Sequence, residues 1–251
     1  MTYNISSKVE PKETPKGQID CHRITITEDG INKFEFEHEF LPDYVDYDIG
    51  HWKGYPGGED RRRRLSLASN IWQVGWYLPP YKFGSPEKYD LTNHILKNKK
   101  PQVFYARLLA LSMYVKAKKE NFGIFDANII VPVPNFRLDD NSSAVSISKE
   151  LAKIMNENGT RITFKENLLK KTKDVEAKKI SPDKKEEFYS KNKLYEFRED
   201  LAGMGYLRGK KVILVDDVVT QGYAAEQCLK ELSNQGVENL CFYCVATTKM
   251  R

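Results

Sequence analysis

A pair of adjacent carboxylates followed by a glycine is the feature of this sequence best suited to chemistry. Asp216 and Asp217 follow the apolar run at residues 212–215, and Gly222 comes five residues after the second carboxylate. An uninterrupted apolar run is typical of a strand covered on both faces, and ligands bind where the parallel strands of such sheets end. Carboxylates at that point can accept strong, charge-assisted hydrogen bonds from two sugar hydroxyls.

The turn after the carboxylates suits a phosphate group. We expect the backbone amides of residues 218–222 to converge at the start of a helix that ends near Gly236. The N-terminus of a helix favours an anion, and Gly222 lets the backbone approach that anion closely. The segment therefore predicts a sugar-phosphate site, with carboxylates on the ring hydroxyls and the loop on the phosphate.

The surrounding pattern predicts the elements that would position this motif. Buried-type strands are expected at residues 128–131, 161–164, 212–215 and 240–246, and amphipathic helices begin near residues 101, 144 and 224. The alternation of strands and helices is typical of an α/β domain with a parallel sheet flanked by helices. We expect this domain to span residues 91–251. Between its strands, residues 165–210 are lysine-rich and predict exposed, partly mobile structure.

The N-terminal part of the chain has a different character. Residues 1–20 are polar and predict a disordered tail. Residues 23–40 alternate between apolar and polar side chains around an Asp-Gly turn, which predicts a β-hairpin. A helix is expected over residues 62–76. Residues 21–90 as a whole predict an extension or hood of unknown role, rich in Gly, Pro and aromatic side chains.

The run from Arg61 to Arg64 lies in this aromatic region and permits two interpretations. It could form a base-stacking or partner-docking surface with the nearby tryptophans. The alternative, which we favour, is a small subdomain packed by aromatic side chains, with a solvated arginine run. Sequence alone separates the two poorly, because stacking surfaces and cores contain the same residue types.

Composition excludes several classes of protein. The chain has 251 residues, 40% of them hydrophobic, and its 40 Lys and Arg against 35 Asp and Glu give a formal net charge of +5. This surplus is too mild for a dedicated nucleic-acid binder, and its local maximum is at residues 161–211. No apolar run is long enough to cross a membrane, and no signal peptide is evident at the start. Four cysteines without a pairing pattern favour a reducing cytoplasm over a disulfide scaffold.

Two other patterns in the sequence permit different interpretations. An Asp-Asp pair after an apolar strand also occurs in response-regulator and phosphatase-like folds, where carboxylates bind magnesium directly, but the Val-Val-Thr-Gln-Gly continuation favours a sugar phosphate. Cys241 and Cys244 have the gap of a zinc knuckle without a second pair. In a strand they point to opposite faces, so we interpret both as buried packing residues.

The segment at residues 212–222 resembles the phosphoribosyl-pyrophosphate-binding motif of type I phosphoribosyltransferases. More narrowly, residues 91–251 are similar to the ComF-like branch, which is related to a bacterial competence protein. Weaker likenesses occur in the expected order at Ile130-Val131-Pro132-Val133-Pro134, Ser148-Lys149-Glu150-Leu151-Ala152, Lys191-Asn192, Phe197 and Gly209-Lys210-Lys211.

The resemblance implies a role for each of these segments. Asp216 and Asp217 would hold the ribose hydroxyls as the catalytic pair. The 5′-phosphate would lie on Val218, Val219, Thr220, Gln221, Gly222 and Tyr223. The pyrophosphate would face a loop made of Pro134, Asn135, Phe136 and Arg137. Mg²⁺ would be held mainly by oxygens of the ligand, without direct protein ligands.

The implied reaction is displacement of pyrophosphate from the anomeric carbon by a nitrogenous base or nucleotide-like acceptor, or its reverse. Such catalysis requires positioning and charge stabilisation rather than a protein nucleophile. The sequence departs from the family at Gln221, Tyr223 and Ala224, where further Thr, Ser or small residues are usual, and at Asp139-Asp140, whose charges would repel pyrophosphate. The four-cysteine zinc module of competence-type members is absent, since Cys21 stands without a partner at this end of the chain.

These observations leave three functions open. The first is a cytoplasmic phosphoribosyltransferase that uses phosphoribosyl pyrophosphate or a nucleoside monophosphate. The second is a sensor or effector with the same fold and weakened turnover, which acts in a protein complex through residues 34–89. The third, which we favour least, is nucleic-acid binding through Arg61–Arg64 and the nearby aromatics. A homo-oligomer is compatible with each of them.

Overall fold

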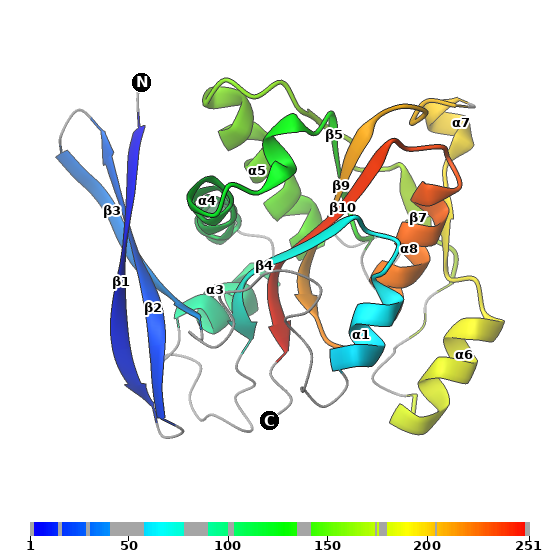
Figure 1. Cartoon of the computed structure of the whole chain (residues 1–251), viewed down its shortest axis with the longest axis horizontal. Helices are drawn as coiled ribbons and strands as arrows, with labels where there is room; N and C mark the ends of the chain where they lie inside the picture. Colours follow the sequence, from blue (N-terminus) through cyan, green and yellow to red (C-terminus); the bar gives the residue numbers. More distant parts are fainter. Residues whose placement is uncertain are drawn as a thin grey trace.

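A five-stranded parallel sheet forms the centre of the computed structural model (Figure 1). Its strand order is β4-β10-β9-β5-β6, and every neighbouring pair is parallel. The strands are β4 (Asn70–Tyr77), β5 (Ile129–Pro132), β6 (Thr163–Phe164), β9 (Lys211–Val219) and β10 (Asn239–Thr248). The structure describes residues 3–14, 17–28, 31–40, 58–77, 90–99, 103–134, 142–173, 175, 180–203 and 205–248.

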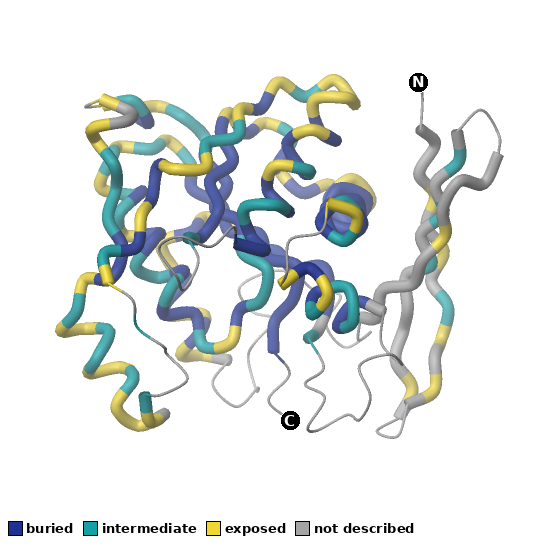
Figure 2. The backbone as a smooth tube through the Cα atoms, turned by 180° about the vertical axis from the view of Figure 1, so that it is seen from behind, coloured by how far each residue is buried: buried dark blue, intermediate teal, exposed yellow. Residues whose placement is uncertain are grey.

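Helices cover both faces of this sheet, which confirms the predicted α/β fold class. One face packs against α3 (Asp90–Asn98), α4 (Val103–Lys119) and α5 (Ser143–Glu157). The other face packs against α8 (Tyr223–Ser233) and the segment that follows α1 (Gly58–Arg64). The short helix η4 (Gly123–Asp126) precedes β5. Figure 2 shows the buried residues concentrated in the strands and the inner sides of these helices.

The apolar run of β9 explains its central position. Successive side chains of a strand point to opposite faces, so Ile213 and Val215 enter the core under α4 and α5, while Val212 and Leu214 enter the core under α8. All four are at most 1% exposed. The cysteines of β10 follow the same rule, because Cys241 belongs to the first core and Cys244 to the second. Their prediction as buried packing residues is confirmed.

The helix predicted over residues 62–76 is wrong in its second half. Helix α1 ends at Arg64, and Asn70–Tyr77 is the edge strand β4, which pairs in parallel with β10. Branched and aromatic side chains favour a strand, and the open edge of β10 offered a partner that a local pattern cannot reveal. Because β4 belongs to the main sheet, the predicted start of the α/β domain at residue 91 is too late.

Trp72 of β4 shows whether this part of the aromatic region is a stacking surface or a packed core. It is 8% exposed, stacks on Phe122 with ring centroids 5.0 Å apart, and meets the edge of Tyr243 at 6.2 Å. This residue therefore packs in the core rather than on a stacking surface. Trp52 lies outside the described residues.

A three-stranded antiparallel sheet lies at the N-terminal end of the chain, at the left in Figure 1. It contains β1 (Tyr3–Thr14), β2 (Gly17–Glu28) and β3 (Ile31–Phe40). The β2–β3 pair confirms the predicted hairpin. The predicted disordered tail over residues 1–20 is wrong for the described part of it, because β1 pairs with β2 along its whole length. The composition of residues 1–20 describes this segment in isolation, whereas in the structure its backbone groups form hydrogen bonds with β2.

The lysine-rich segment at residues 165–210 is more ordered than we expected. It contains β7 (Leu169–Lys171), η6 (Pro182–Lys184), α6 (Lys185–Lys191), β8 (Tyr195–Phe197) and α7 (Glu199–Ala202). Strands β7 and β8 form an antiparallel pair, and Leu169, Leu194 and Tyr195 are buried in the core beside α8. Among the described residues, no helix is long and apolar enough to cross a membrane.

Candidate functional site

The two predicted carboxylates lie inside β9, beyond the point where its neighbour β5 ends. The β5–β9 pairing stops at Pro132 opposite Val215, while β10 continues beside β9 as far as Val219. From Asp216 onward, β9 therefore has a paired strand on only one side among the described residues. The apolar run predicted that the strand ends at Val215, but β9 continues to Val219 because it stays hydrogen-bonded to β10 beyond the carboxylates.

The two carboxylates differ in their surroundings. Strand geometry turns their side chains to opposite faces of the sheet. Asp216 lines a cavity of about 160 Å³ above the loop that follows β9. The Asp217 carboxylate accepts a hydrogen bond from the backbone N–H of Val218 at 2.7 Å, and Asp217 does not line this cavity. The structure thus brings one of the two predicted catalytic carboxylates into the site.

The environment of Asp216 disfavours its charge. Burial is the main cause and the neighbouring carboxylate of Asp217 adds to it, and together they raise the pKa of Asp216 well above its usual value. The negative charge of Asp216 in turn helps burial to raise the pKa of the Cys228 and Cys244 thiols. Groups with pKa values perturbed in this way are frequent in functional sites.

The loop at residues 220–222 has the geometry expected of an anion site. Gly222 is the N-cap of α8 and has φ +86°, in the left-handed region that favours glycine. The first amides of α8 have no acceptor within the helix. The cavity above them is lined by residues 218–225 together with Lys185 and Tyr189. Every residue predicted for the 5′-phosphate, from Val218 to Tyr223, therefore borders one cavity.

The hydroxyl groups of the loop are engaged within the protein. The Thr220 hydroxyl lies 3.2 Å from that of Thr248, and the Tyr223 hydroxyl accepts a hydrogen bond from Arg64 at 2.8 Å. Around a bound anion, the cavity offers backbone amides, Lys185 and the side chain of Gln221 as hydrogen-bond donors.

Helix α1 packs behind this loop through two buried arginines. Arg61 is 2% exposed and donates to the carbonyl of Thr220, and Arg64 is 7% exposed and donates to the carbonyl of Gln221 at 3.1 Å. Carbons of both side chains lie within 4 Å of the position that a Cβ on Gly222 would occupy. Burial lowers the pKa of Arg61 to about 10, so its guanidinium remains charged at pH 7.

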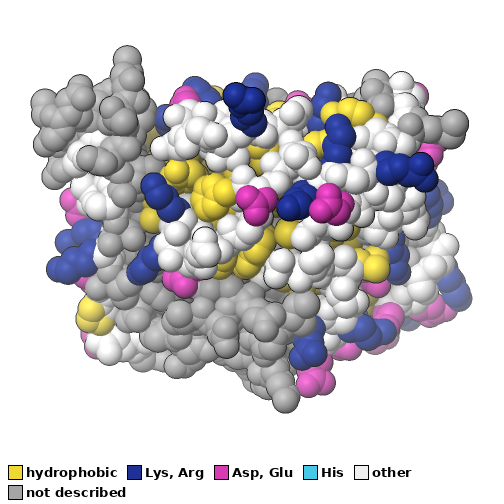
Figure 3. Space-filling model, turned by 45° about the horizontal axis from the view of Figure 1, so that its top comes forward, with side chains coloured by type: hydrophobic (Ala, Val, Ile, Leu, Met, Phe, Trp, Pro, Cys, Tyr) yellow, Lys and Arg dark blue, Asp and Glu magenta, His cyan; other side chains and the backbone are white. Residues whose placement is uncertain are grey.

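The arginine run is therefore neither a solvated stretch nor a continuous basic surface. Two of its four members are buried under the loop, and Arg63 forms an ion pair with Glu186 at 2.7 Å. On the face drawn in Figure 3, basic and acidic side chains are interspersed around small hydrophobic patches. Burial of Arg61 and Arg64 removes the main support for nucleic-acid binding, because only exposed charges can contact a phosphate backbone.

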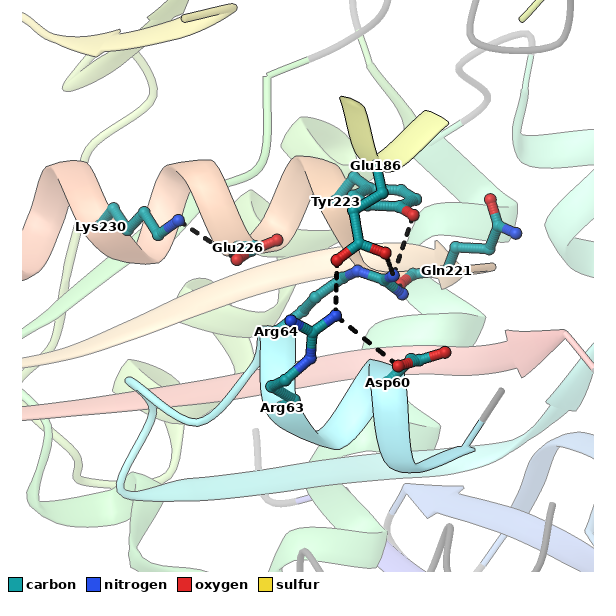
Figure 4. A network of polar contacts seen from close by, with 8 residues as sticks. All are labelled: Asp60, Arg63, Arg64, Glu186, Gln221, Tyr223, Glu226 and Lys230. Atoms are coloured by element: carbon teal, nitrogen blue, oxygen red, sulfur yellow. Dashed lines mark hydrogen bonds and ion pairs between the residues drawn. The ribbon is translucent and has the colours of Figure 1, made fainter. Parts of the chain in front are cut away.

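Helix α6 also contacts this region, and Figure 4 shows its Glu186 next to Arg63 and Arg64 of α1. Glu186 lies 3.6 Å from Arg64, and Tyr189 stacks on Tyr223 with ring centroids 4.7 Å apart and planes 4° from parallel. The Arg64 guanidinium carbon lies 3.9 Å from the centroid of the Tyr223 ring. These contacts tie α1, α6 and α8 together around the cavity.

The loop predicted to bind pyrophosphate is described only at its beginning. Pro134 lies two residues past the end of β5, and Val133 donates its N–H to the carbonyl of Val215 at 2.8 Å. The entry to this loop is thus adjacent to the carboxylates of β9. Asn135, Phe136 and Arg137 lie outside the described residues, as do Asp139 and Asp140. Among the described residues, no group of three or more His, Cys, Asp and Glu could hold a metal ion.

Sequence reasoning missed four residues of the site: Arg61, Arg64, Lys185 and Tyr189. A signal for the arginines existed, because positions three apart on a helix share a face. Arg61 and Arg64 therefore point one way and Arg62 another. No local signal marked Lys185 among the many lysines of its segment.

Comparison with solved structures finds similarity to proteins of phosphoribosyl chemistry. A hypoxanthine phosphoribosyltransferase from Staphylococcus aureus is 11% identical, with a TM-score of 0.37 over 61% of this chain and 71% of that one. The phosphoribosylpyrophosphate synthetase of Mycobacterium smegmatis is 12% identical, with a TM-score of 0.32 over 56% of this chain. A glutamine phosphoribosylpyrophosphate amidotransferase from B. subtilis, solved with ADP and GMP, is 12% identical, with a TM-score of 0.34 over 88% of this chain.

These similarities are distant and partial. The match spans 34% of the synthetase and 35% of the amidotransferase. No protein-family model matches the chain. A comparison of its sequence with curated proteins finds no match.

Proposed function

We propose that this protein binds phosphoribosyl pyrophosphate or a nucleoside monophosphate and transfers the phosphoribosyl group between pyrophosphate and a nitrogenous base. The observation that carries the proposal is the cavity lined by Asp216, Lys185 and the residues at the start of α8. A carboxylate suits sugar hydroxyls, while amides and an ammonium group suit a phosphate. The motif at residues 212–222 resembles that of type I phosphoribosyltransferases over the same residues.

In this proposal the loop and Lys185 hold the 5′-phosphate, and Asp216 orients the ribose by accepting a hydrogen bond from a ring hydroxyl. Asp217 would reach the second hydroxyl only after its contact with the N–H of Val218 is exchanged. The pyrophosphate would lie toward Pro134, just past the point where β5 pairs with Val215 of β9. Positive charge that develops on the ribose during transfer would be stabilised by the ionised form of Asp216.

In this proposal Mg²⁺ would be held mainly by oxygens of the bound ligand, as the family resemblance implies. Asp216 lines the cavity, and oxygen donors of this hard kind are those that Mg²⁺ prefers. The ion would supply charge neutralisation for the pyrophosphate. The residues of this chain would bind and orient the sugar.

A second candidate function is a ligand sensor with weakened turnover. The observation that favours it is that the loop carries two hydroxyl groups, on Thr220 and Tyr223, and each already contacts another side chain of the protein. Such a protein would bind the same ligands without releasing pyrophosphate. A cytoplasmic location, a protein partner and self-association are further parts of the proposal.

Calorimetric titration with phosphoribosyl pyrophosphate and nucleoside monophosphates, with and without Mg²⁺, tests the binding step. We expect binding to the native protein and its loss in the double variant Asp216→Asn, Asp217→Asn. Asp126→Asn is the control. It removes an exposed carboxylate from η4, which precedes the N-terminal end of β5 and so lies away from the cavity. Pyrophosphate release with a panel of bases then separates the enzyme from the sensor. Equal binding by the native protein and the double variant would refute the site.

A further inference from the structure

The arginines of α1 hold the loop from the side opposite the cavity. Arg61 and Arg64 each donate to a carbonyl of the loop, at Thr220 and Gln221 respectively. Neither arginine lines the cavity that the loop borders. The loop therefore lies between the two guanidinium groups and the space where an anion would bind.

This placement fixes the direction of two backbone amides. In a trans peptide the C=O of one residue and the N–H of the next point in opposite directions, and the chain has no cis peptide bond among the described residues. A carbonyl of Thr220 drawn toward α1 turns the N–H of Gln221 away from α1. The carbonyl of Gln221, drawn to Arg64, turns the N–H of Gly222 in the same way.

We infer that Arg61 and Arg64 are positioning residues that aim the N–H groups of Gln221 and Gly222 at the ligand phosphate, an inference that rests on the proposed function. They act through the loop and make no contact with the ligand. Donors fixed before binding lose little freedom when the anion arrives. This arrangement supplies the phosphate with backbone donors in addition to the side-chain donors of the loop.

The charges under the loop support an anionic ligand. Burial lowers the pKa of Arg61 to about 10, and the like charge of Arg64 contributes to this shift. Two cations held close together in a buried place repel each other more strongly than in water. A phosphate on the other side of the loop would offset this repulsion.

The test compares three variants of one helix that remove the same formal charge. Arg61→Met and Arg64→Met break the contacts with the loop, while Arg62→Met changes an exposed arginine and serves as the control. The probes are inorganic phosphate and ribose 5-phosphate, titrated by calorimetry on the full chain. We expect Arg61→Met and Arg64→Met to weaken binding about tenfold or more, the effect of one lost hydrogen bond to a charged group. Arg62→Met should bind like the native protein.

A second measurement needs no variant and separates positioning from a purely structural role. In ¹H–¹⁵N spectra of the native protein, phosphate should shift the amide signals of Gln221 and Gly222 downfield as donors to an anion. If phosphate binds and these two signals do not move, the inference is overturned. It is also overturned if Arg61→Met and Arg64→Met bind as tightly as Arg62→Met, and the proposed function then still stands. Failure of the native protein to bind either probe or phosphoribosyl pyrophosphate would instead overturn the proposed function.

Discussion

Replacement of Gly222 by alanine tests whether the left-handed turn before α8 shapes the phosphate site. An L-residue at φ +86° suffers a clash between its Cβ and its own backbone, which costs about 1–2 kcal/mol. The added Cβ would lie 3.5 Å from Cγ of Arg61 and 3.8 Å from Cβ of Arg64. These are ordinary van der Waals distances, so packing against α1 adds little to the cost.

Gly159 provides a matched control. It follows α5, has φ +90°, and an added Cβ would meet no atom within 4 Å. Both variants should therefore lose about 1–2 kcal/mol of unfolding free energy, which corresponds to a fall in melting temperature of roughly 2–8 °C for a chain of this size. Urea denaturation and thermal scans of the two variants measure this directly.

The two variants should differ in ligand affinity. In Gly222→Ala the remaining strain should rotate the loop in part, which would turn the N–H of residue 222 away from the cavity. Loss of one hydrogen bond to a charged group corresponds to about 10- to 150-fold weaker binding of ribose 5-phosphate. Gly159→Ala should bind like the native protein. Unchanged affinity of Gly222→Ala, at a stability cost equal to that of Gly159→Ala, would refute the reasoning.

Two further predictions concern buried groups. Burial and the charge of Asp217 raise the pKa of Asp216, so the folded state holds a proton that the unfolded state releases above a pKa of about 3.9. The free energy of unfolding of the native protein therefore falls as pH rises toward the folded-state pKa of Asp216. The stability that Asp216→Asn gains over the native protein should grow over the same range, which urea denaturation from pH 5 to 8 measures. A gain independent of pH would contradict this. The thiols of Cys228, Cys241 and Cys244 are buried, and burial raises the pKa of each. An alkylating reagent should therefore label them only as fast as the protein unfolds, which mass spectrometry measures. Rapid labelling of the native protein would contradict this prediction.

The sequence determined the central elements and the position of the candidate site. The apolar run of β9 had to be buried on both faces, and Gly222 had to begin α8, because these are local consequences of residue type. The cysteines of β10 were assigned to opposite faces by the same alternation that the structure shows.

Only the tertiary structure decided which distant residues complete the site. Helical spacing places Arg61 and Arg64 on one face, but nothing local shows that this face packs behind the loop, and nothing local distinguishes Lys185 from its neighbours. The difference appears when α1 packs behind the loop and α6 packs across it. Strand β4 likewise exists because the edge of β10 was open to a partner more than 160 residues earlier in the chain. Pairing between distant segments leaves little trace in a local pattern, since its free energy is gained only when both segments are brought together.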